Sequence, residues 1–139
     1  MGIGKELTRQ PLRLARNRVY RTYRGGALLD RWQGVAQPTD GYFPEEWVGS
    51  TTVSRLPGRP KNEGLSQVLL PDGSTPVLKQ LIEQDPEGML GAAHVARHGT
   101  DLAVLCKILD STMRLAIQIH PNRAFAKQHC HSGFKKTES

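Results

Sequence analysis

Residues 113–120 read MRLAIQIH, and this short stretch constrains the fold more than any other part of the 139-residue chain. Its apolar residues alternate strictly with the others: Met113, Leu115, Ile117 and Ile119 against Arg114, Ala116, Gln118 and His120. Because successive side chains of a β-strand point to opposite faces, the alternation predicts a strand with Gln118 and His120 together on its less apolar face. Pro121 ends this strand, since proline cannot donate a ladder hydrogen bond.

Gln118 and His120 have the chemistry of metal ligands. An amide oxygen and an imidazole nitrogen on one strand face can supply two donors to the same ion. A carboxylate from an adjacent strand would add charge, and Glu138 is the nearest candidate in the sequence. Nitrogen and oxygen donors without a thiolate suit zinc or another divalent transition metal. The alternative is a polar pair that faces solvent or is satisfied locally.

The remaining periodicity predicts further strands and a group of helices. Strand patterns occur at residues 18–23, 45–53 and 102–109. Helical patterns occur at residues 28–32, 77–84, 87–97 and 121–128. Thr75 and Pro76 form a typical helix start, with a hydroxyl cap followed by proline at the first helical position. Residues 54–74 are rich in proline and glycine and are expected to be mostly loop.

The order of these elements predicts a mainly β fold with a helical insert, in the α+β class. The length of 139 residues suits one domain. Residues 1–16 are expected to form an irregular basic lead-in. Residues 17–139 form the domain itself, with the helical insert at about 75–98.

The chain carries a formal net charge of +6, and much of it lies in a crowded N-terminal region. The basic residues there are Lys5, Arg9, Arg13, Arg16, Arg18, Arg21 and Arg24. Such an excess suits an anionic partner, either a nucleic acid or a phosphorylated small molecule, or forms a solvated basic face. No zinc-finger, RNP or helix-turn-helix signature accompanies the arginines, so nucleic acid is the less favoured partner.

Composition also bounds the cellular setting. No run of about 18 apolar residues is present, so no membrane partner is expected, and no apolar secretory signal is seen. We therefore expect a cytoplasmic protein. Cys106 and Cys130 are too few for a disulfide framework and are expected to be free thiols, with Cys106 in the core.

Two other clusters of possible metal ligands are weaker. His94 and His98 have helical spacing, but the glutamate of a metalloprotease motif is missing between them. His129, Cys130 and His131 are consecutive, and adjacent residues rarely bind one ion together. We expect surface histidines in the first cluster and a polar loop in the second. Neither a Walker phosphate loop nor a GxSxG elbow occurs.

The chain resembles the N-terminal part of the type I mannose-6-phosphate isomerases, a family of cupin-fold metalloenzymes. The resemblance rests on two terminal segments, LAVLCKILDSTMRLAIQIHPN and GFKKTES. The upstream segments RTYRGGALLDRWQG and FPEEWVGST are also similar to the opening region of that family. The resemblance therefore runs from about Arg18 to Ser139. It implies a cupin-like jelly-roll, here as an incomplete half barrel.

The resemblance implies metal ligands at Gln118, His120 and Glu138. A further histidine of the family comes from a later strand, which this sequence does not contain. Asn122 stands where aspartate is commoner in the family, and Lys135 stands where glycine is common. Neither departure removes a ligand.

The implied reaction interconverts mannose 6-phosphate and fructose 6-phosphate, so a phosphorylated hexose is the expected partner. A proton moves between adjacent carbons, and a divalent ion can disperse the charge that develops on the sugar oxygens. Lys136 would share a strand face with Glu138 and is the candidate catalytic contact to substrate. Lys107 and Ser111 are weaker candidates of the same kind.

The resemblance also sets expectations for the isolated chain. A half-built barrel exposes strand edges, so self-association through those edges is expected. We expect a truncated fragment with little or no isomerase activity of its own. The competing hypothesis is a non-catalytic module whose basic face recruits an anionic partner.

Overall fold

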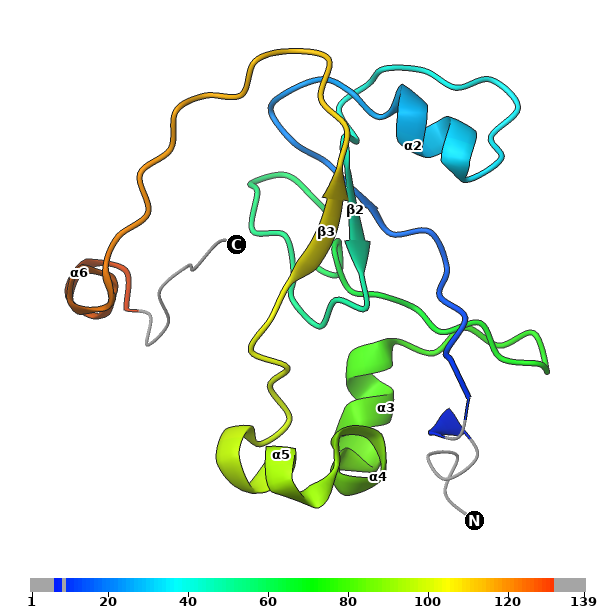
Figure 1. Ribbon diagram of the computed structural model, residues 1–139, viewed down its shortest axis with the longest axis vertical. Coiled ribbons are helices and arrows are strands. Elements are labelled where there is room, and N and C mark those ends of the chain that lie inside the picture. Colours follow the sequence, from blue (N-terminus) through cyan, green and yellow to red (C-terminus); the bar gives the residue numbers. More distant parts are fainter. Residues whose placement is uncertain (1–6, 9, 132–139) are drawn as a thin grey trace.

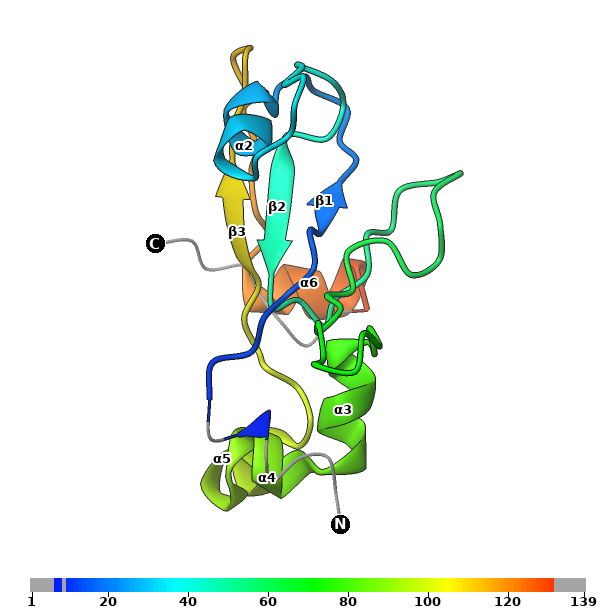
Figure 2. The same cartoon turned by 90° about the vertical axis from the view of Figure 1, so that its right-hand side faces the viewer.

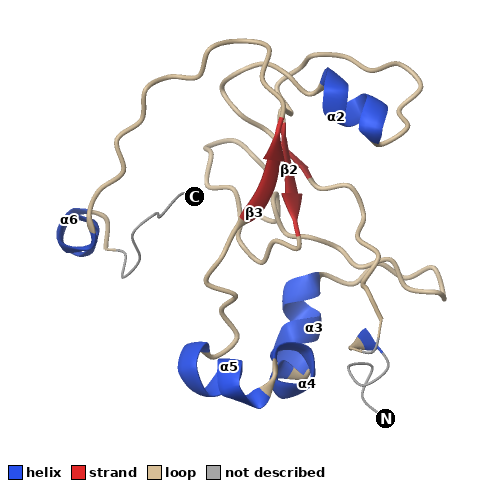
Figure 3. Cartoon of the chain, in the orientation of Figure 1, coloured by secondary structure: helices blue, strands red, loops and turns tan. Residues whose placement is uncertain are grey.

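The computed structural model describes residues 7, 8 and 10–131, which form a small antiparallel sheet and several short helices (Figures 1 and 3). The strands are β1 (Arg18–Val19), β2 (Glu45–Val48) and β3 (Cys106–Leu109). The helices are α2 (Ala27–Trp32), α3 (Leu78–Gln84), α4 (Pro86–Leu90), α5 (Ala92–His98) and α6 (Arg123–His129). The fold is a small mixed α/β arrangement.

The sheet places β2 between β1 and β3, and both pairings are antiparallel. In this register Val19 lies opposite Glu45. Trp47 lies opposite Lys107. Directly opposed residues project to the same side of a sheet, and so do residues two apart along a strand. Glu45, Trp47 and Lys107 therefore share one face, although 62 residues separate Glu45 from Lys107.

Helix α3 begins later than the sequence predicts. Its cap position is Val77, which makes no side-chain capping bond, so the predicted start at Thr75 and Pro76 is wrong by two residues. The reason is a tertiary contact. The backbone N–H of Leu78 donates to the carbonyl of Ser66 at 2.8 Å, which satisfies a free helix N–H without a hydroxyl cap. The helix ends at Gln84, as the Asp85–Pro86 pair predicts.

The single helix expected at 87–97 is two helices, α4 and α5. The chain breaks at Gly91, which has a positive φ of 83°. Helix α4 begins with Pro86 at its first turn, and the Asp85 carboxylate accepts a bond from the backbone N–H of Gly88 at 3.1 Å. This side-chain cap explains why a new helix starts directly after α3 ends.

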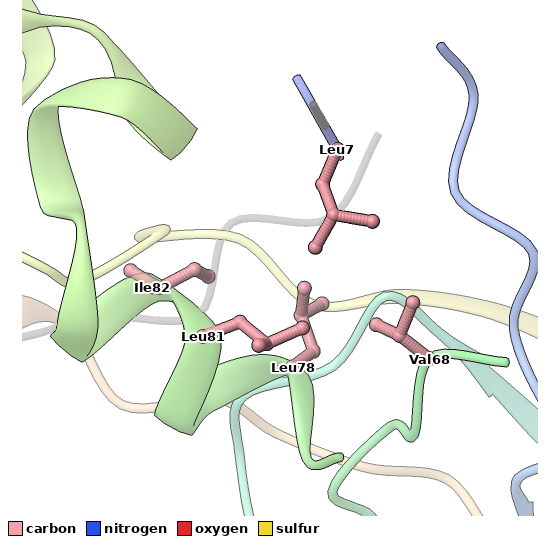
Figure 4. Close-up of a cluster of buried hydrophobic side chains, with 5 residues drawn as sticks. All are labelled: Leu7, Val68, Leu78, Leu81 and Ile82. Atoms are coloured by element: carbon pink, nitrogen blue, oxygen red, sulfur yellow. The ribbon is translucent and has the colours of Figure 1, made fainter. Parts of the chain in front are cut away.

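The main apolar core lies where α3, the loop that precedes it and Leu7 of the N-terminal segment meet, toward one end of the molecule (Figures 2 and 4). Its buried members are Leu7, Val68, Leu78, Leu81 and Ile82. Helices α3, α4 and α5 gather at this end, whereas α2 lies at the opposite end of the sheet (Figure 2). The sheet therefore stands between α2 and the group of helices α3, α4 and α5.

Strands are shorter than the sequence predicts, and the expected predominance of β structure is not found in the described part. The segments predicted at 18–23, 45–53 and 102–109 form strands only at Arg18–Val19, Glu45–Val48 and Cys106–Leu109. Beyond these limits the backbone bonds to loop residues, as when the N–H of Arg21 donates to the Tyr42 carbonyl at 2.8 Å. No helix within the described residues is long and apolar enough to cross a bilayer.

Candidate active site

The structure places Gln118 and His120 on an exposed, extended connection between β3 and α6. Residues 113–120 have neither helix nor strand assignment, so the predicted strand is not formed. A strand requires a neighbour to receive its backbone hydrogen bonds, and within the described residues β3 pairs with β2 alone. The connection instead runs away from the sheet toward α6 (Figure 1). Gln118 and His120 are both exposed, and Ile119 between them is 92% exposed.

Glu138 and Lys136, the other two predicted site residues, lie outside the described residues. The donor set therefore has two described members, an amide and an imidazole, which fit two positions of a zinc-type site. Within residues 7, 8 and 10–131 no cluster of three or more histidine, cysteine, aspartate or glutamate side chains could hold a metal. The ligand assignment accordingly remains a prediction that depends on Glu138.

Helix α6 gives the connection a defined end. Asn122 is its cap residue, and the side-chain oxygen accepts a bond from the backbone N–H of Phe125 at 2.9 Å. Asparagine at position 122, where aspartate is commoner in the family, therefore keeps the helix cap, because asparagine caps helices as well as aspartate does. The helix predicted over 121–128 is confirmed, with bounds of Arg123–His129.

A buried carboxylate surrounded by hydrogen-bond donors, which the sequence did not reveal, lies on the face of the sheet that carries Lys107. The carboxylate is that of Glu45, which is 2% exposed. Its Oε1 accepts a bond from the Tyr23 hydroxyl at 2.7 Å, and its Oε2 accepts one from Trp47 Nε1, also at 2.7 Å. The Arg21 guanidinium lies 2.9 Å from Oε2, and Lys107 Nζ lies 3.4 Å from Oε1. Four donors therefore converge on one buried carboxylate. We call Glu45 and its partners Arg21, Tyr23, Trp47 and Lys107 the Glu45 cluster.

Part of the Glu45 cluster could have been found from the sequence. Val19, Arg21 and Tyr23 fall on the same face of the alternating pattern at 18–23, and Val19 proves to lie opposite Glu45. The pattern thus indicates that Arg21 and Tyr23 point to one side. The pattern does not indicate that they contact Glu45, because the pairing of β1 with β2 joins segments that are distant in the sequence.

The Glu45 cluster shifts the pKa values of its members in opposite directions. Burial alone raises the pKa of Glu45, but the bonds from Tyr23, Trp47 and Arg21, together with the Arg21 charge, outweigh it and lower that pKa to about 2. Burial, followed by the bond to the Glu45 carboxylate, raises the pKa of the Tyr23 hydroxyl. Glu45 is therefore a charged acceptor and Tyr23 a neutral donor over the physiological range.

This Glu45 shift predicts an acid-dependent loss of stability. The free energy of unfolding should fall as pH drops from about 4.5 toward about 2, because unfolded Glu45 takes up a proton before folded Glu45 does. Glu45→Gln should reduce this fall by about 2 kcal/mol, allowing for the solvent that reaches the cluster. Denaturant titrations at a series of pH values from about 6 to about 2 measure both proteins. Parallel pH profiles would contradict the assignment.

Three of the N-terminal arginines contact carboxylates of this chain. Arg16 and Arg18 both contact Asp30, at 3.1 and 2.9 Å, and Arg21 contacts Glu45. Arg18 keeps only 10% of its side chain exposed. Two carboxylates, Asp30 and Glu45, therefore offset part of the positive charge of the N-terminal region, and recruitment of an anionic partner stays a prediction.

The weaker candidates for substrate contact, Lys107 and Ser111, differ in how far their polar groups are already used. Lys107 retains 29% exposure beside Glu45, so it has donors to offer a ligand. The Ser111 hydroxyl is used in a local turn, where it donates to the Met113 carbonyl at 2.6 Å. Cys106 is exposed, so its predicted place in the core is wrong, because β3 is the last strand of the sheet among the described residues.

Histidines of the two weaker clusters, 94/98 and 129–131, contact other groups of this chain. His94 and His98 lie with ring centroids 5.1 Å apart, and His94 Nε2 bonds to the carbonyl of Asp101 at 2.8 Å. The His129 ring lies 4.3 Å from that of Phe125 on α6. A hollow of about 440 Å³ lies elsewhere, beside Trp32, Glu46 and Val48, and no predicted site residue lines it.

Comparison with known proteins identifies the family. Residues 23–137 match the family described as phosphomannose isomerase type I, catalytic domain. The chain belongs to this family. The matched range contains the predicted ligand positions Gln118 and His120, and it contains Glu45 with its partners Tyr23, Trp47 and Lys107 but not Arg21.

Curated relatives match over a limited part of their length. Mannose-6-phosphate isomerase of Salmonella typhimurium is 33% identical over 108 residues, which cover 78% of this chain and 24% of the relative. The Escherichia coli K12 protein of the same name is 32% identical over 106 residues, with 73% and 24% coverage. The chain thus spans about a quarter of the length of the curated relatives it matches.

A solved structure supports the same relationship. The crystal structure of a histidine-to-glutamine mutant of phosphomannose isomerase from Salmonella typhimurium superposes with a TM-score of 0.61 at 26% sequence identity. The match covers 86% of this chain and 29% of that one. The described fold is therefore similar to one portion of a larger isomerase.

Proposed function

We propose that this chain supplies part of the active site of a metal-dependent sugar-phosphate isomerase that interconverts mannose 6-phosphate and fructose 6-phosphate. The single observation that carries the proposal is the family match over residues 23–137, which contains Gln118 and His120. We propose that these residues belong to a cupin-like jelly-roll whose domain begins near residue 17. The superposition on part of a phosphomannose isomerase supports this arrangement.

The metal-binding role falls to three side chains of this chain. Gln118 offers its amide oxygen, His120 an imidazole nitrogen and Glu138 its carboxylate, a set that suits zinc among the divalent metals. When bound, the ion would polarise the sugar oxygens and disperse charge that develops on them.

The Glu45 cluster has a supporting role in the same proposal. Glu45 holds Lys107 Nζ at 3.4 Å, while Lys107 remains partly exposed. Lys107 can therefore donate to a phosphate or hydroxyl oxygen of a sugar phosphate from an oriented position. Lys136 is proposed as a second substrate contact, on sequence grounds.

A metal-binding experiment tests the ligand set. Gln118→Ala, His120→Ala and Glu138→Ala should each weaken zinc binding by at least about tenfold, because each removes one of few donors. Equilibrium dialysis against a zinc buffer measures the change. His94→Ala is a matched control, since His94 already bonds to the Asp101 carbonyl and should leave binding unaltered. Unchanged binding in all three ligand variants would refute the site.

A further inference from the structure

The face of the sheet opposite the Glu45 cluster carries a second buried carboxylate, that of Glu46. Successive residues of a strand point to opposite faces, so Glu46 and Val48 of β2 point away from the Glu45 side. Glu46 lies opposite Arg18 in β1 and Ile108 in β3. Only 5% of Glu46 is exposed, so its charge lies almost entirely within the protein.

Both hydrogen-bond partners of the Glu46 carboxylate are neutral. Its Oε1 accepts a bond from the backbone N–H of Asn17, and its Oε2 accepts one from Gln33 Nε2, each at 2.7 Å. Among the described residues no cationic side chain forms an ion pair with Glu46, whereas Glu45 contacts both Arg21 and Lys107. Buried charges are normally paired, because neutral donors replace lost hydration only in part.

Glu46 lines a hollow of about 440 Å³ between the end of α2, β2 and the segment that leads into β1. Its donor Gln33 lines the same hollow, so the carboxylate end of Glu46 is near it. Leu14, Trp32 and Val48 supply apolar walls, and the Trp32 residue is 66% exposed. A hollow of this size, with apolar walls and few polar groups, suits a small organic molecule.

We propose that this hollow binds a small organic amine, with its ammonium group against the Glu46 carboxylate and its apolar stem against Trp32. Each carboxylate oxygen can accept two hydrogen bonds, and the structure shows one on each oxygen. An ammonium group supplies donors for the remaining positions together with the positive charge that Glu46 lacks. The indole face of Trp32 attracts both a cation and an apolar stem.

Other cations fit this hollow less well. A divalent metal ion needs several oxygen ligands, and Glu46 is the only carboxylate among the described residues that line the hollow. Arg16 also lines it, with 48% of its side chain exposed, and its charge opposes a ligand that carries a second cationic group. The site therefore favours a monoamine with one apolar or aromatic stem over a metal ion or a polyamine.

Titration of the full 139-residue chain with phenethylamine tests the proposal. This amine is protonated near neutral pH, and isothermal titration calorimetry measures its affinity. Phenethyl alcohol is the matched ligand, because it carries a hydroxyl group in place of the ammonium group on the same stem. We expect the amine to bind at least about tenfold more tightly than the alcohol, since hydrogen bonds to charged groups are the stronger ones.

Two variants locate the site. Glu46→Gln should weaken binding of the amine by at least about tenfold and change binding of the alcohol by less than about threefold, because only the charge contact is lost. Trp32→Ala should weaken binding of both ligands by about fivefold, because their common stem loses its wall. Leu28→Ala is the matched control, since Leu28 is 62% exposed on the same helix and lies outside the lining of the hollow.

The outcomes separate clearly. Equal affinity for the amine and the alcohol would overturn the proposal, because the Glu46 charge would then take no part in binding. Binding that is as sensitive to Leu28→Ala as to Trp32→Ala would overturn it too. Absence of binding up to about 10 mM amine, a concentration that detects even weak small ligands, would show that the hollow takes no such group. Trp32→Ala keeps the test decisive if Glu46→Gln does not fold, because the Trp32 side chain is largely exposed.

This inference goes beyond the proposed isomerase function and does not depend on it. Gln118, His120 and Lys107 do not line the hollow. Binding is measured without a sugar phosphate or a metal ion, so failure of the isomerase proposal would leave the amine result unchanged.

Discussion

Replacing Glu45 by glutamine is expected to lower the free energy of unfolding by about 3 kcal/mol. The substitution keeps the shape of the side chain and removes its charge, so Arg21 loses an ion pair while only 17% of its side chain is exposed. A buried cation without its partner is costly because it cannot recover its hydration. Lys107 loses its contact too, and because the Tyr23 hydroxyl and Trp47 Nε1 donate to different oxygens of Glu45, one of them is left facing the new amide NH2 in place of an acceptor.

Thermal and urea unfolding of both proteins at neutral pH measure the loss. Glu83→Gln is the control, because Glu83 is half exposed and contacts Lys79 only at 4.0 Å. That exposed pair should contribute less than about 0.5 kcal/mol. If the two variants unfold alike, the Glu45 cluster does not stabilise the sheet in the way its geometry implies.

Replacing Gly25 by alanine is expected to cost about 3 kcal/mol, because the added methyl group meets backbone atoms. Its Cβ would lie 2.0 Å from the carbonyl oxygen of Asp110 and 2.9 Å from the Cα of Ser111. This backbone cannot yield easily. The Asp110 carboxylate accepts bonds from the backbone N–H groups of Gly26 and Leu28, at 3.1 and 2.7 Å, and so ties the end of β3 to the start of α2.

Gly41→Ala is a close control for Gly25→Ala. Gly41 exchanges two backbone bonds with Gly25, at 2.9 and 3.0 Å, yet its added Cβ would meet nothing within 4 Å. It should change the free energy of unfolding by less than about 0.5 kcal/mol. Urea unfolding measures both variants, and an equal loss in the two would show that the contact with Asp110 is not the cause.

Local signals in the sequence predict several elements well. Helix α2 and helix α6 occur where short helical patterns were seen, and α3 ends at the Asp85–Pro86 pair. These features depend on neighbours within a few residues, such as the Asn122 cap and the proline that follows α3. The start of α3 was misplaced because a distant backbone carbonyl, that of Ser66, receives its first N–H.

The candidate site likewise has a part that the sequence predicts and a part that depends on distant contacts. The alternation in 113–120 identifies Gln118 and His120 as a pair, and the resemblance of the segment GFKKTES to the family adds Glu138 as a proposal. Whether that stretch becomes a strand depends on a partner strand, which no periodicity in the stretch can supply. The Glu45 cluster was missed for a related reason, since Lys107 reaches Glu45 across 62 residues.

By itself the sequence determined the residue types, their alternation along the chain and the motifs that mark an isomerase family, because all three are properties of near neighbours. Only the tertiary structure decided which faces meet. It joined Arg21, Tyr23 and Lys107 around one buried carboxylate, and it left the apolar residues of 104–125 exposed. Pairing of distant strands is a competition among many possible partners, and its outcome depends on the total packing and hydrogen bonding of the folded chain.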